Sequence, residues 1–422
     1  MTNKIKKTKE ILEKQLFVIK PTKKEQEDIK DKTKDFIRKL EKNIKKKKIE
    51  ADVFVGGSLA KGTLIKKDKY DIDIFVRFDK KYQDNELSKI LEKVISEKKA
   101  KRIHGSRDYF QIKDNKGKII FEIVPSVKIS RPEKARNVTD LSYFHVNYVK
   151  KQINKNKKLA DDIMLAKSFT YSCGCYGAES YIQGFSGYAL ELLVIYYKGF
   201  LNFIKKTAEM KFPLVLDPAK HYKNREETLL EINESKLQSP IVFVDPTFKQ
   251  RNVLAALSEE TFNKFKISCR DFLKNPSSRF FEKQEINEKN FNLIIEAKTN
   301  RQKGDIAGSK LRKFHGFISK ELEKYFDIKK QEFSYDEKRN TARLYFSLKK
   351  KPRLITQGPY ATDIHNLMRF KKKHPKAIIK KGKAWSIEKN KITFQRFIKE
   401  FKIKNKKIIK EMGISGIKLI RN

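Results

Sequence analysis

A glycine-rich turn followed by a pair of aspartates constrains this chain more than any other segment. Gly56-Gly57-Ser58 follows an apolar run at residues 52–55, and Asp71-Ile72-Asp73 opens a β-rich run that continues to residue 78. Glycine and serine between short apolar runs are typical of turns that separate strands. The segment therefore predicts a strand, a glycine turn, a short helix and a second strand.

The two aspartates predict a metal site. Alternate residues of a strand point to the same face, so Asp71 and Asp73 place their carboxylates side by side. Ile72 and Ile74 then point into the core. Two adjacent carboxylates repel each other unless a cation lies between them, and Mg²⁺ takes oxygen ligands from carboxylates, water and substrate phosphates. Asp71 and Asp73 are therefore candidate catalytic and metal-binding residues for phosphoryl or nucleotidyl transfer.

The glycine turn supplies groups that suit a triphosphate. Gly56 and Gly57 let the backbone approach a ligand closely, and amides at a helix start can hold phosphate together with the Ser58 hydroxyl. Lys61 follows one helical turn later, where its ammonium group can pair with phosphate. The order of glycine turn and aspartate pair, with β-rich flanks, is far more specific than either piece alone.

A third carboxylate is expected on a neighbouring strand, because two-metal sites usually have one. Residues 109–113 and 118–127 flank the turn-rich tetrad at residues 114–117, which predicts a β-hairpin. Glu122 is the single acid in the second apolar run of this hairpin, and it is our candidate. The alternative is that Glu122 points to solvent on an edge strand.

The first part of the chain reads as an α/β unit. Apolar residues at helical spacing predict amphipathic helices at residues 22–48 and 87–95, on either side of the aspartate strand. From residue 142 the pattern becomes mainly helical, with apolar residues at three- and four-residue intervals in residues 160–170, 188–206 and 251–272.

The last part of the chain begins at a linker. Asn275-Pro276-Ser277-Ser278 is the clearest linker signal, strand-like and helical periods mix after it, and a lysine-dense tail with interleaved apolar residues starts at residue 369. We therefore expect a multi-domain α+β fold. Its three domains are residues 1–140 with a mixed or antiparallel sheet, a mainly helical neck at 141–274, and an α+β body with a folded basic tail at 275–422.

The charge of the chain points to a polyanionic partner. The sequence has 98 Lys and Arg against 52 Asp and Glu, a formal net charge of +46. A nucleic acid is the natural partner for such an excess. The alternative is that part of the excess reflects a lysine-rich organism rather than binding.

Cysteine usage and hydropathy indicate the compartment. The three cysteines, Cys173, Cys175 and Cys269, form neither a disulfide framework nor a zinc quartet. The N-terminus leads into no apolar h-region, and the best apolar run, residues 187–197, contains Glu191 and is too short to span a membrane. We expect a soluble, cytoplasmic protein with no membrane partner.

Several motifs together resemble a known family. The glycine turn and aspartate pair resemble the DNA polymerase β nucleotidyltransferase superfamily, and the downstream motifs narrow the resemblance to the archaeal (class I) CCA-adding enzymes, the tRNA nucleotidyltransferases. These motifs are Phe144-His145, Leu165-Ala166-Lys167, Cys175-Tyr176-Gly177-Ala178-Glu179, Gly184-Phe185-Ser186-Gly187-Tyr188 with Glu191-Leu192-Leu193, Val244-Asp245-Pro246 and Arg251-Asn252-Val253. The resemblance covers residues 30 to 265 well and thins beyond them.

The resemblance implies a polymerase-β-like head, Mg²⁺ as cofactor, and template-independent addition of CCA to the 3′ end of tRNA from CTP and ATP. It implies a homodimer that binds the acceptor and TΨC arms. Among single residues it implies metal binding by Asp71, Asp73 and Glu122, triphosphate contacts by Ser58 and Lys61, and further nucleotide contacts by His145, Lys167, Tyr176 and Arg251.

Two positions depart from the family pattern. Glu122 stands where the family usually has Asp, and Gln183 stands where it often has Arg. The alternatives are another RNA 3′-nucleotidyltransferase, such as a poly(A) or uridylyl polymerase, or an inactive RNA-binding relative. For single residues the alternatives are that His145 packs against Phe144, that Tyr176 is core, and that Lys167 is a surface lysine.

Overall fold

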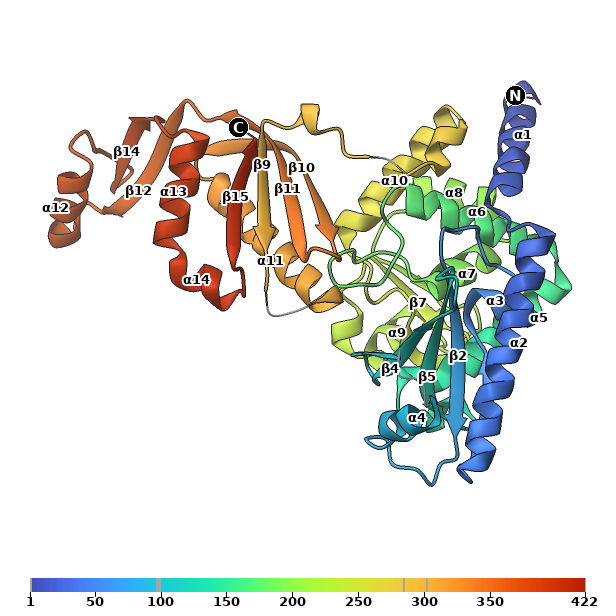
Figure 1. Ribbon diagram of the computed structural model, residues 1–422. Coiled ribbons are helices and arrows are strands. Elements are labelled where there is room, and N and C mark those ends of the chain that lie inside the picture. The colour runs from blue at the N-terminus through green and yellow to red at the C-terminus, as the bar shows by residue number, and fades with distance from the viewer. Residues whose placement is uncertain (1, 96–99, 284, 301–302, 422) are drawn as a thin grey trace. The chain divides into compact units, whose positions relative to one another are not determined.

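The computed structural model describes residues 2–95, 100–283, 285–300 and 303–421. The chain forms two compact units, the first made of residues 1–178 and 182–284 and the second of residues 179–181 and 285–422 (Figure 1). The division into three domains at residues 140 and 274 stays a prediction. No helix within the described ranges is both long and apolar enough to cross a bilayer.

A five-stranded sheet organises the start of the first unit. The strands are β1 (Ala51–Val55), β2 (Tyr70–Phe78), β5 (Ile119–Val127), β4 (Tyr109–Lys113) and β3 (Lys101–Ile103), in that spatial order. β2 and β5 are parallel, whereas the other neighbours are antiparallel. The mixed sheet and the hairpin of β4 and β5 are confirmed.

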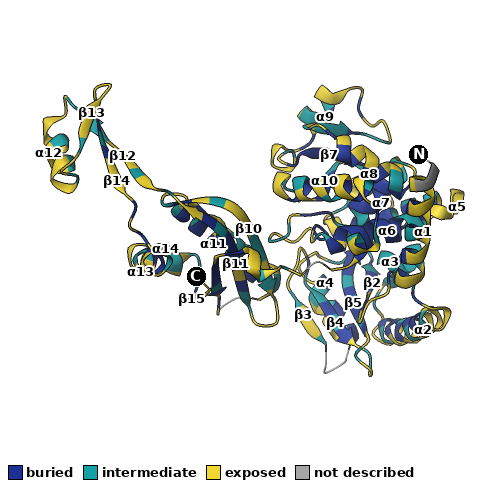
Figure 2. Ribbon diagram, turned by 90° about the horizontal axis from the view of Figure 1, so that it is seen from above, coloured by how far each residue is buried: buried dark blue, intermediate teal, exposed yellow. Residues whose placement is uncertain are grey.

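Two helices cover one face of this sheet. They are α2 (Lys23–Lys46) and α4 (Leu87–Ile95). α2 buries Ile29, Phe36 and Leu40 at helical spacing, and a capping box between Thr22 and Glu25 fixes its start. These side chains share one core with the inward residues of β2, β5 and β4. Figure 2 colours the chain by burial and shows buried stretches along β2 and β5. The opposite face of β2 and β5 is left for polar residues.

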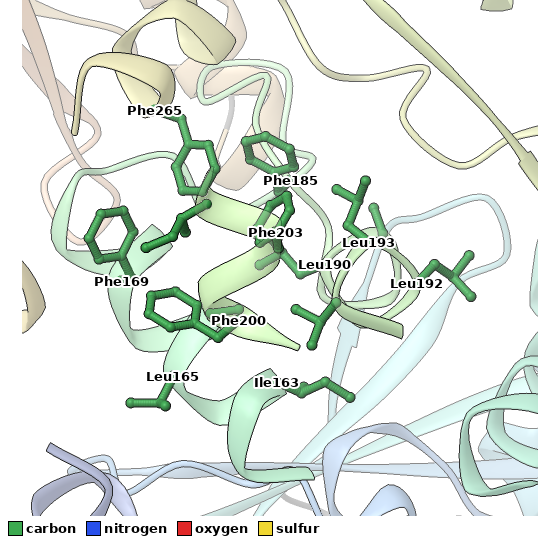
Figure 3. Packing of buried hydrophobic residues seen from close by; sticks show 14 of the residues in the cluster. Ile163, Leu165, Phe169, Phe185, Leu190, Leu192, Leu193, Phe200, Phe203 and Phe265 are labelled. Carbon is green, nitrogen blue, oxygen red and sulfur yellow. The ribbon is translucent and has the colours of Figure 1, made fainter. Parts of the chain in front are cut away.

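The rest of the first unit is mainly helical. Its helices are α1 (Thr2–Ile19), α3 (Gly57–Lys61), α5 (Ser142–Lys155), α6 (Lys158–Ser172), α7 (Gly187–Tyr196), α8 (Phe200–Glu209), α9 (Arg225–Glu231) and α10 (Glu259–Lys274), and a small sheet contains β6 (Leu214–Leu216), β7 (Ile241–Asp245) and β8 (Phe248–Asn252). Short 3-10 turns lie at Pro132–Lys134, Val138–Leu141, Glu234–Lys236 and Ser278–Phe281. Phenylalanines of α6, α8 and α10 meet in one core, which Figure 3 shows around Phe169, Phe200 and Phe265.

Two helical predictions are wrong in part. The stretch at residues 188–206 is broken between α7 and α8 at Gly199, whose φ of 133° lies in the region that favours glycine. The stretch at 251–272 is helical only from Glu259, because β8 pairs with β7 through Asn252 and Val244. Pairing of β8 with the preceding strand β7 here overrides the helical spacing.

The second unit is α+β. One antiparallel sheet has the order β10 (Phe326–Asp336), β11 (Thr341–Lys350), β9 (Leu293–Lys298) and β15 (Gly416–Arg421), and it shares a core with α11 (Gly304–Leu322) and α13 (Phe394–Lys404). A second sheet has the order β12 (Arg353–Tyr360), β14 (Lys383–Lys389) and β13 (Ile378–Lys380), and the remaining helices are α12 (Ile364–Lys373), α14 (Lys406–Glu411) and a 3-10 turn at Glu288–Asn290. The lysine-dense tail is folded, as expected.

Candidate active site

The three candidate metal carboxylates lie on adjacent strands. Asp71 and Asp73 are on β2 and Glu122 is on β5, and the parallel register places Asp73 directly opposite Glu122. Ile72 and Ile74 are fully buried on the other face, as predicted. β5 lies between β2 and β4, so the alternative that places Glu122 on an edge strand is wrong.

The electrostatics of these carboxylates show mutual repulsion. Burial raises the pKa of Asp73; Lys61 opposes this rise and Asp71 adds to it. Burial and the neighbouring Asp73 raise the pKa of Glu122 to about 7, although Gln111 donates a hydrogen bond of 2.8 Å to its Oε1 atom. Negative charge is therefore concentrated on one patch of the sheet.

The donor set fits a hard divalent cation. Oxygen ligands from two or three carboxylates, completed by water and phosphate, are what Mg²⁺ prefers, and Asp71, Asp73 and Glu122 share the polar face of two adjacent strands. In the described part of the chain, no three His, Cys, Asp or Glu side chains are gathered at distances suited to a metal ion. The fit consequently rests on the chemistry of the donors and on their register.

Both glycines of the turn are required by their closeness to β2. The Gly56 amide donates to the Asp73 carbonyl at 2.8 Å, and a Cβ at Gly56 would overlap the Phe75 ring. Gly57 has a φ of 55°, and a Cβ there would overlap the Asp73 carboxylate. The glycines thus bring α3, which begins at Gly57, against the aspartate strand.

A cavity of about 320 Å³ brings most predicted site residues together. The predicted residues that line it are Gly57, Ser58, Lys61, Asp71, Asp73, Lys167 and Tyr176. Residues that the sequence did not single out for the site also line it: Thr63, Lys67, Tyr171, Tyr188 and Glu191. The side chains predicted to bind phosphate and the aspartate pair therefore line one cavity.

Glu191 on α7 joins the two lysines of this cavity. Its Oε2 atom lies 2.6 Å from Lys61 Nζ, and its Oε1 atom lies 2.9 Å from Lys167 Nζ. Burial alone would raise the pKa of Glu191, but Lys167 and Lys61 outweigh burial and hold that pKa below its ordinary value. Lys167 is buried, so the alternative of a surface lysine is wrong. The lone acid in the apolar run 187–197 was the sequence signal for Glu191.

Tyr176 lies between the hydrophobic core and the cavity. Its ring stacks on Tyr171 with centroids 4.0 Å apart, and Lys67 donates to the Tyr171 hydroxyl at 2.9 Å. A Cβ at Gly187 would lie 2.8 Å from the Tyr176 hydroxyl, so this glycine leaves room for the tyrosine. Tyr176 thus packs against the core, as its alternative predicts, and its partly exposed side chain also lines the cavity.

His145 and Arg251 line a second cavity, of about 300 Å³, together with Glu122. Both contact Asp245, whose Oδ2 atom lies 3.0 Å from His145 Nε2 and 3.0 Å from Arg251. The hydrogen bond from His145 and the charge of Arg251 hold the pKa of the buried Asp245 well below its usual range. Asp245 was missed as a site residue, although it lay within a quoted motif.

Tyr188 connects the two cavities. It lines the first, its ring stacks on His145 with centroids 4.1 Å apart, and its hydroxyl donates to Asp245 at 3.1 Å. His145 therefore packs on Tyr188 and pairs with Asp245, in place of the predicted alternative of packing on Phe144. Burial lowers the pKa of His145.

Comparisons with known proteins identify two domain families and several relatives of this chain. Residues 37–139 match the family model of the nucleotidyltransferase domain, and residues 161–282 match that of the tRNA nucleotidyltransferase second domain. A CCA-adding enzyme of Nanoarchaeum equitans is 38% identical over 80% of this chain and 83% of its own length. A CCA-adding enzyme of Methanocaldococcus jannaschii is 31% identical over 89% of this chain and 86% of its own length.

Solved structures show the same fold at low identity. A cytoplasmic RNA terminal U-transferase aligns with a TM-score of 0.51 at 15% identity, over 67% of this chain and 100% of its own. A poly(U) polymerase aligns with a TM-score of 0.52 at 15% identity, over 65% of this chain and 98% of its own. These likenesses concern the fold alone.

Proposed function

The chain belongs to the family of the CCA-adding enzymes, and we propose that it adds the 3′-terminal CCA of tRNA without a nucleic-acid template. It uses CTP twice and then ATP, and it releases pyrophosphate. The observation that carries the proposal is the single cavity in which Ser58 and Lys61 face the aspartate pair in a chain of this family.

The triphosphate binds at the lysine side of the cavity. The Ser58 hydroxyl and the Lys61 ammonium group offer hydrogen bonds, and Lys167 adds positive charge, which suits phosphate oxygens. Tyr176 contacts the sugar or the base, since its partly exposed ring lines the same space. This arrangement directs the α-phosphate of the nucleotide toward β2.

Asp71, Asp73 and Glu122 would hold the metal. Mg²⁺, when bound, supplies charge neutralisation at the phosphates and a lowered pKa for the attacking hydroxyl. The tRNA 3′-terminal hydroxyl releases its proton to water and its oxygen attacks the α-phosphorus, while the bond from this phosphorus to the pyrophosphate oxygen breaks and pyrophosphate leaves. The lysines hold the phosphates, and the three carboxylates would hold the ion beside the reacting phosphate.

His145 and Arg251 contact the incoming nucleotide from the second cavity. Asp245 fixes both side chains through its buried carboxylate, and Tyr188 packs on His145. An arginine held in this way presents fixed donors, which suits reading a base edge. Arg251 is therefore the residue that we expect to help select C over A together with the RNA.

The proposed partners are tRNA and a second copy of this chain, in the cytoplasm. The surplus of positive charge suits contacts with tRNA phosphates and 2′-hydroxyls, and we place the acceptor and TΨC arms against the second unit and its basic tail. The homodimer stays a prediction. The cytoplasm is the proposed compartment, because Cys173, Cys175 and Cys269 are unpaired thiols.

One assay separates this function from its alternatives. The protein is incubated with Mg²⁺, with CTP and ATP of which one is labelled, and with tRNA that lacks its terminal CCA, CA or A. We expect each of these tRNAs to be completed to CCA, and no addition to complete tRNA. Long homopolymer tails would favour a poly(A) or uridylyl polymerase, and no incorporation would favour an inactive RNA-binding relative.

A further inference from the structure

We propose that Glu191 is a positioning residue for the nucleotide triphosphate, which it serves by holding the Lys61 ammonium group in place for phosphate. The inference deepens the proposed function and rests on it, because it assigns a role in the same cavity. It starts from one contact, the bridge from a single carboxylate to both Lys61 and Lys167.

Burial makes this bridge necessary. The side chains of Lys61, Lys167 and Glu191 are only 8%, 5% and 1% exposed. Without the Glu191 carboxylate, the two ammonium groups would repel each other strongly, because they are withdrawn from water. Removing one partner of such a buried set leaves uncompensated charge, so Glu191 offsets the repulsion between the two ammonium groups and holds the two lysines close together.

The hydrogen bonds of the two lysines differ. Lys167 Nζ donates to Glu191 Oε1 at 2.9 Å, to Thr63 Oγ1 at 2.9 Å and to the Thr63 carbonyl at 3.4 Å. An ammonium group has three donors, so Lys167 is fully used. Lys61 makes one such bond among the described residues, to Glu191, and has donors left for phosphate.

Three segments meet at this carboxylate. Glu191 lies on the same face of α7 as Gly187 and Tyr188, which also line the cavity. Leu190, Leu192 and Leu193 of the same helix belong to the core, as Figure 3 shows, and they fix its position. Thr63 follows α3 and donates to Glu191 at 3.3 Å. Lys167 and Thr63 thus lock Glu191, and Glu191 aims Lys61.

A binding experiment without metal tests this role. Titration calorimetry in EDTA measures the affinity of the full chain for inorganic tripolyphosphate, CTP and CMP. We expect Glu191→Gln to lower the affinity for tripolyphosphate and for CTP about tenfold, the scale of a hydrogen bond to a charged group. The affinity for CMP should stay unchanged. An equal loss for CMP, or tighter binding of CTP, would overturn the proposal.

Two further variants make the test specific. Because Glu191 acts through Lys61, Glu191→Gln should cause no further loss of CTP affinity in a Lys61→Met background, and additive losses would overturn the proposal. Thr63→Val, at a fully buried position, provides a second test in case Glu191→Gln fails to fold. It should lower the affinity for CTP but not the affinity for CMP. An unchanged ratio of CTP to CMP affinity in Thr63→Val would contradict the proposal.

A matched control removes a different, partly buried carboxylate. Asp162 lies on α6, the helix of Lys167, and accepts a bond from the Phe200 amide at 3.2 Å. Asp162→Asn should leave the ratio of CTP to CMP affinity unchanged, and a fall equal to that of Glu191→Gln would overturn the proposal. If Glu191→Gln lowers the affinity for CTP as expected but the wild-type chain adds no nucleotide to tRNA, the proposed function alone is refuted.

Discussion

Asp73 on β2 lies directly opposite Glu122 on β5, in the parallel register of two neighbouring strands of the five-stranded sheet. Their carboxylates come from segments separated by α4, β3 and β4 in the chain. The hairpin of β4 and β5 brings Glu122 back to the aspartate strand, so the sheet topology itself builds the proposed metal site.

Loss of either aspartate should remove catalysis and spare tRNA binding. We expect Asp71→Ala or Asp73→Ala to reduce CTP incorporation at least about 1,000-fold, because metal ligands supply several kcal/mol of transition-state stabilisation. The affinity for tRNA, measured by filter binding, should stay nearly unchanged. As a control, Asp52→Ala removes a carboxylate of β1 that pairs with Arg77 outside the cavity and should stay active. An equal fall in tRNA affinity would indicate a structural role for the aspartates.

Glu122 should act through its charge. Glu122→Gln keeps the size of the side chain and a contact with Gln111, but it removes a metal ligand. We expect it to lower the rate of CTP incorporation and to raise the Mg²⁺ concentration that half-maximal activity needs. Glu122→Asp keeps the charge and should retain most activity. Mg²⁺ titrations of the two variants check this, and a fully active Glu122→Gln would exclude Glu122 as a ligand.

The salt dependence of tRNA binding should reveal how much of the charge surplus is used. Contacts with RNA phosphates release counterions, so the logarithm of the affinity falls linearly with the logarithm of salt concentration. We expect a slope that corresponds to roughly 10 phosphate contacts or fewer, far below the net charge of +46. A slope near zero would contradict phosphate binding as the main source of affinity.

Local patterns predicted the strand, turn and strand that hold the aspartates because their signals are short-range. Alternation placed Asp71 and Asp73 on one face, and the buried Ile72 and Ile74 confirm it. Ser58 and Lys61 were found in the same way. The lysine pairing with Glu191 was not, because it depends on how α6 and α7 pack against the end of α3.

Contacts between elements and strand pairing explain why the role of Asp245 and the strand at Arg251 were not predicted. Asp245 is a site residue through its bonds to His145 and Arg251, which come from α5 and β8. The spacing around Arg251 favoured a helix, but pairing of β8 with β7 wins there. A lone acid in an apolar run, as at Glu191, indicates a buried carboxylate with a basic partner.

Gly57 should not tolerate a side chain. Its φ of 55° and the closeness of the Asp73 carboxylate mean that Gly57→Ala adds both backbone strain and a clash. We expect a loss of about 1–3 kcal/mol in unfolding free energy and a strong fall in CTP incorporation. Gly62→Ala is the matched control, since Gly62 ends the same helix at a φ of 68° with nothing near its Cβ. It should cost about 1 kcal/mol and stay active, and similar inactivation of both variants would contradict the clash.

His315 in the second unit should make stability depend on pH. It is buried on α11 with no partner for Nε2 in the described part of the chain, and burial, with Arg312 nearby, lowers its pKa to about 3. Above the ordinary pKa of about 6.5 the imidazole is neutral in both states. As the pH falls below that value only the unfolded state takes up the proton, so the folded state loses up to about 1.4 kcal/mol per pH unit until the pH nears 3.

His315→Phe should remove this loss. The ring already stacks on Phe346 with centroids 5.2 Å apart, so phenylalanine suits the site. Denaturant unfolding at pH 7 and pH 5 should show wild type losing about 2 kcal/mol more than the variant over this interval. His365→Gln, at an exposed position in the same unit, should lose as much as wild type. Equal pH dependence of wild type and His315→Phe would mean that His315 takes up its proton in the folded state too.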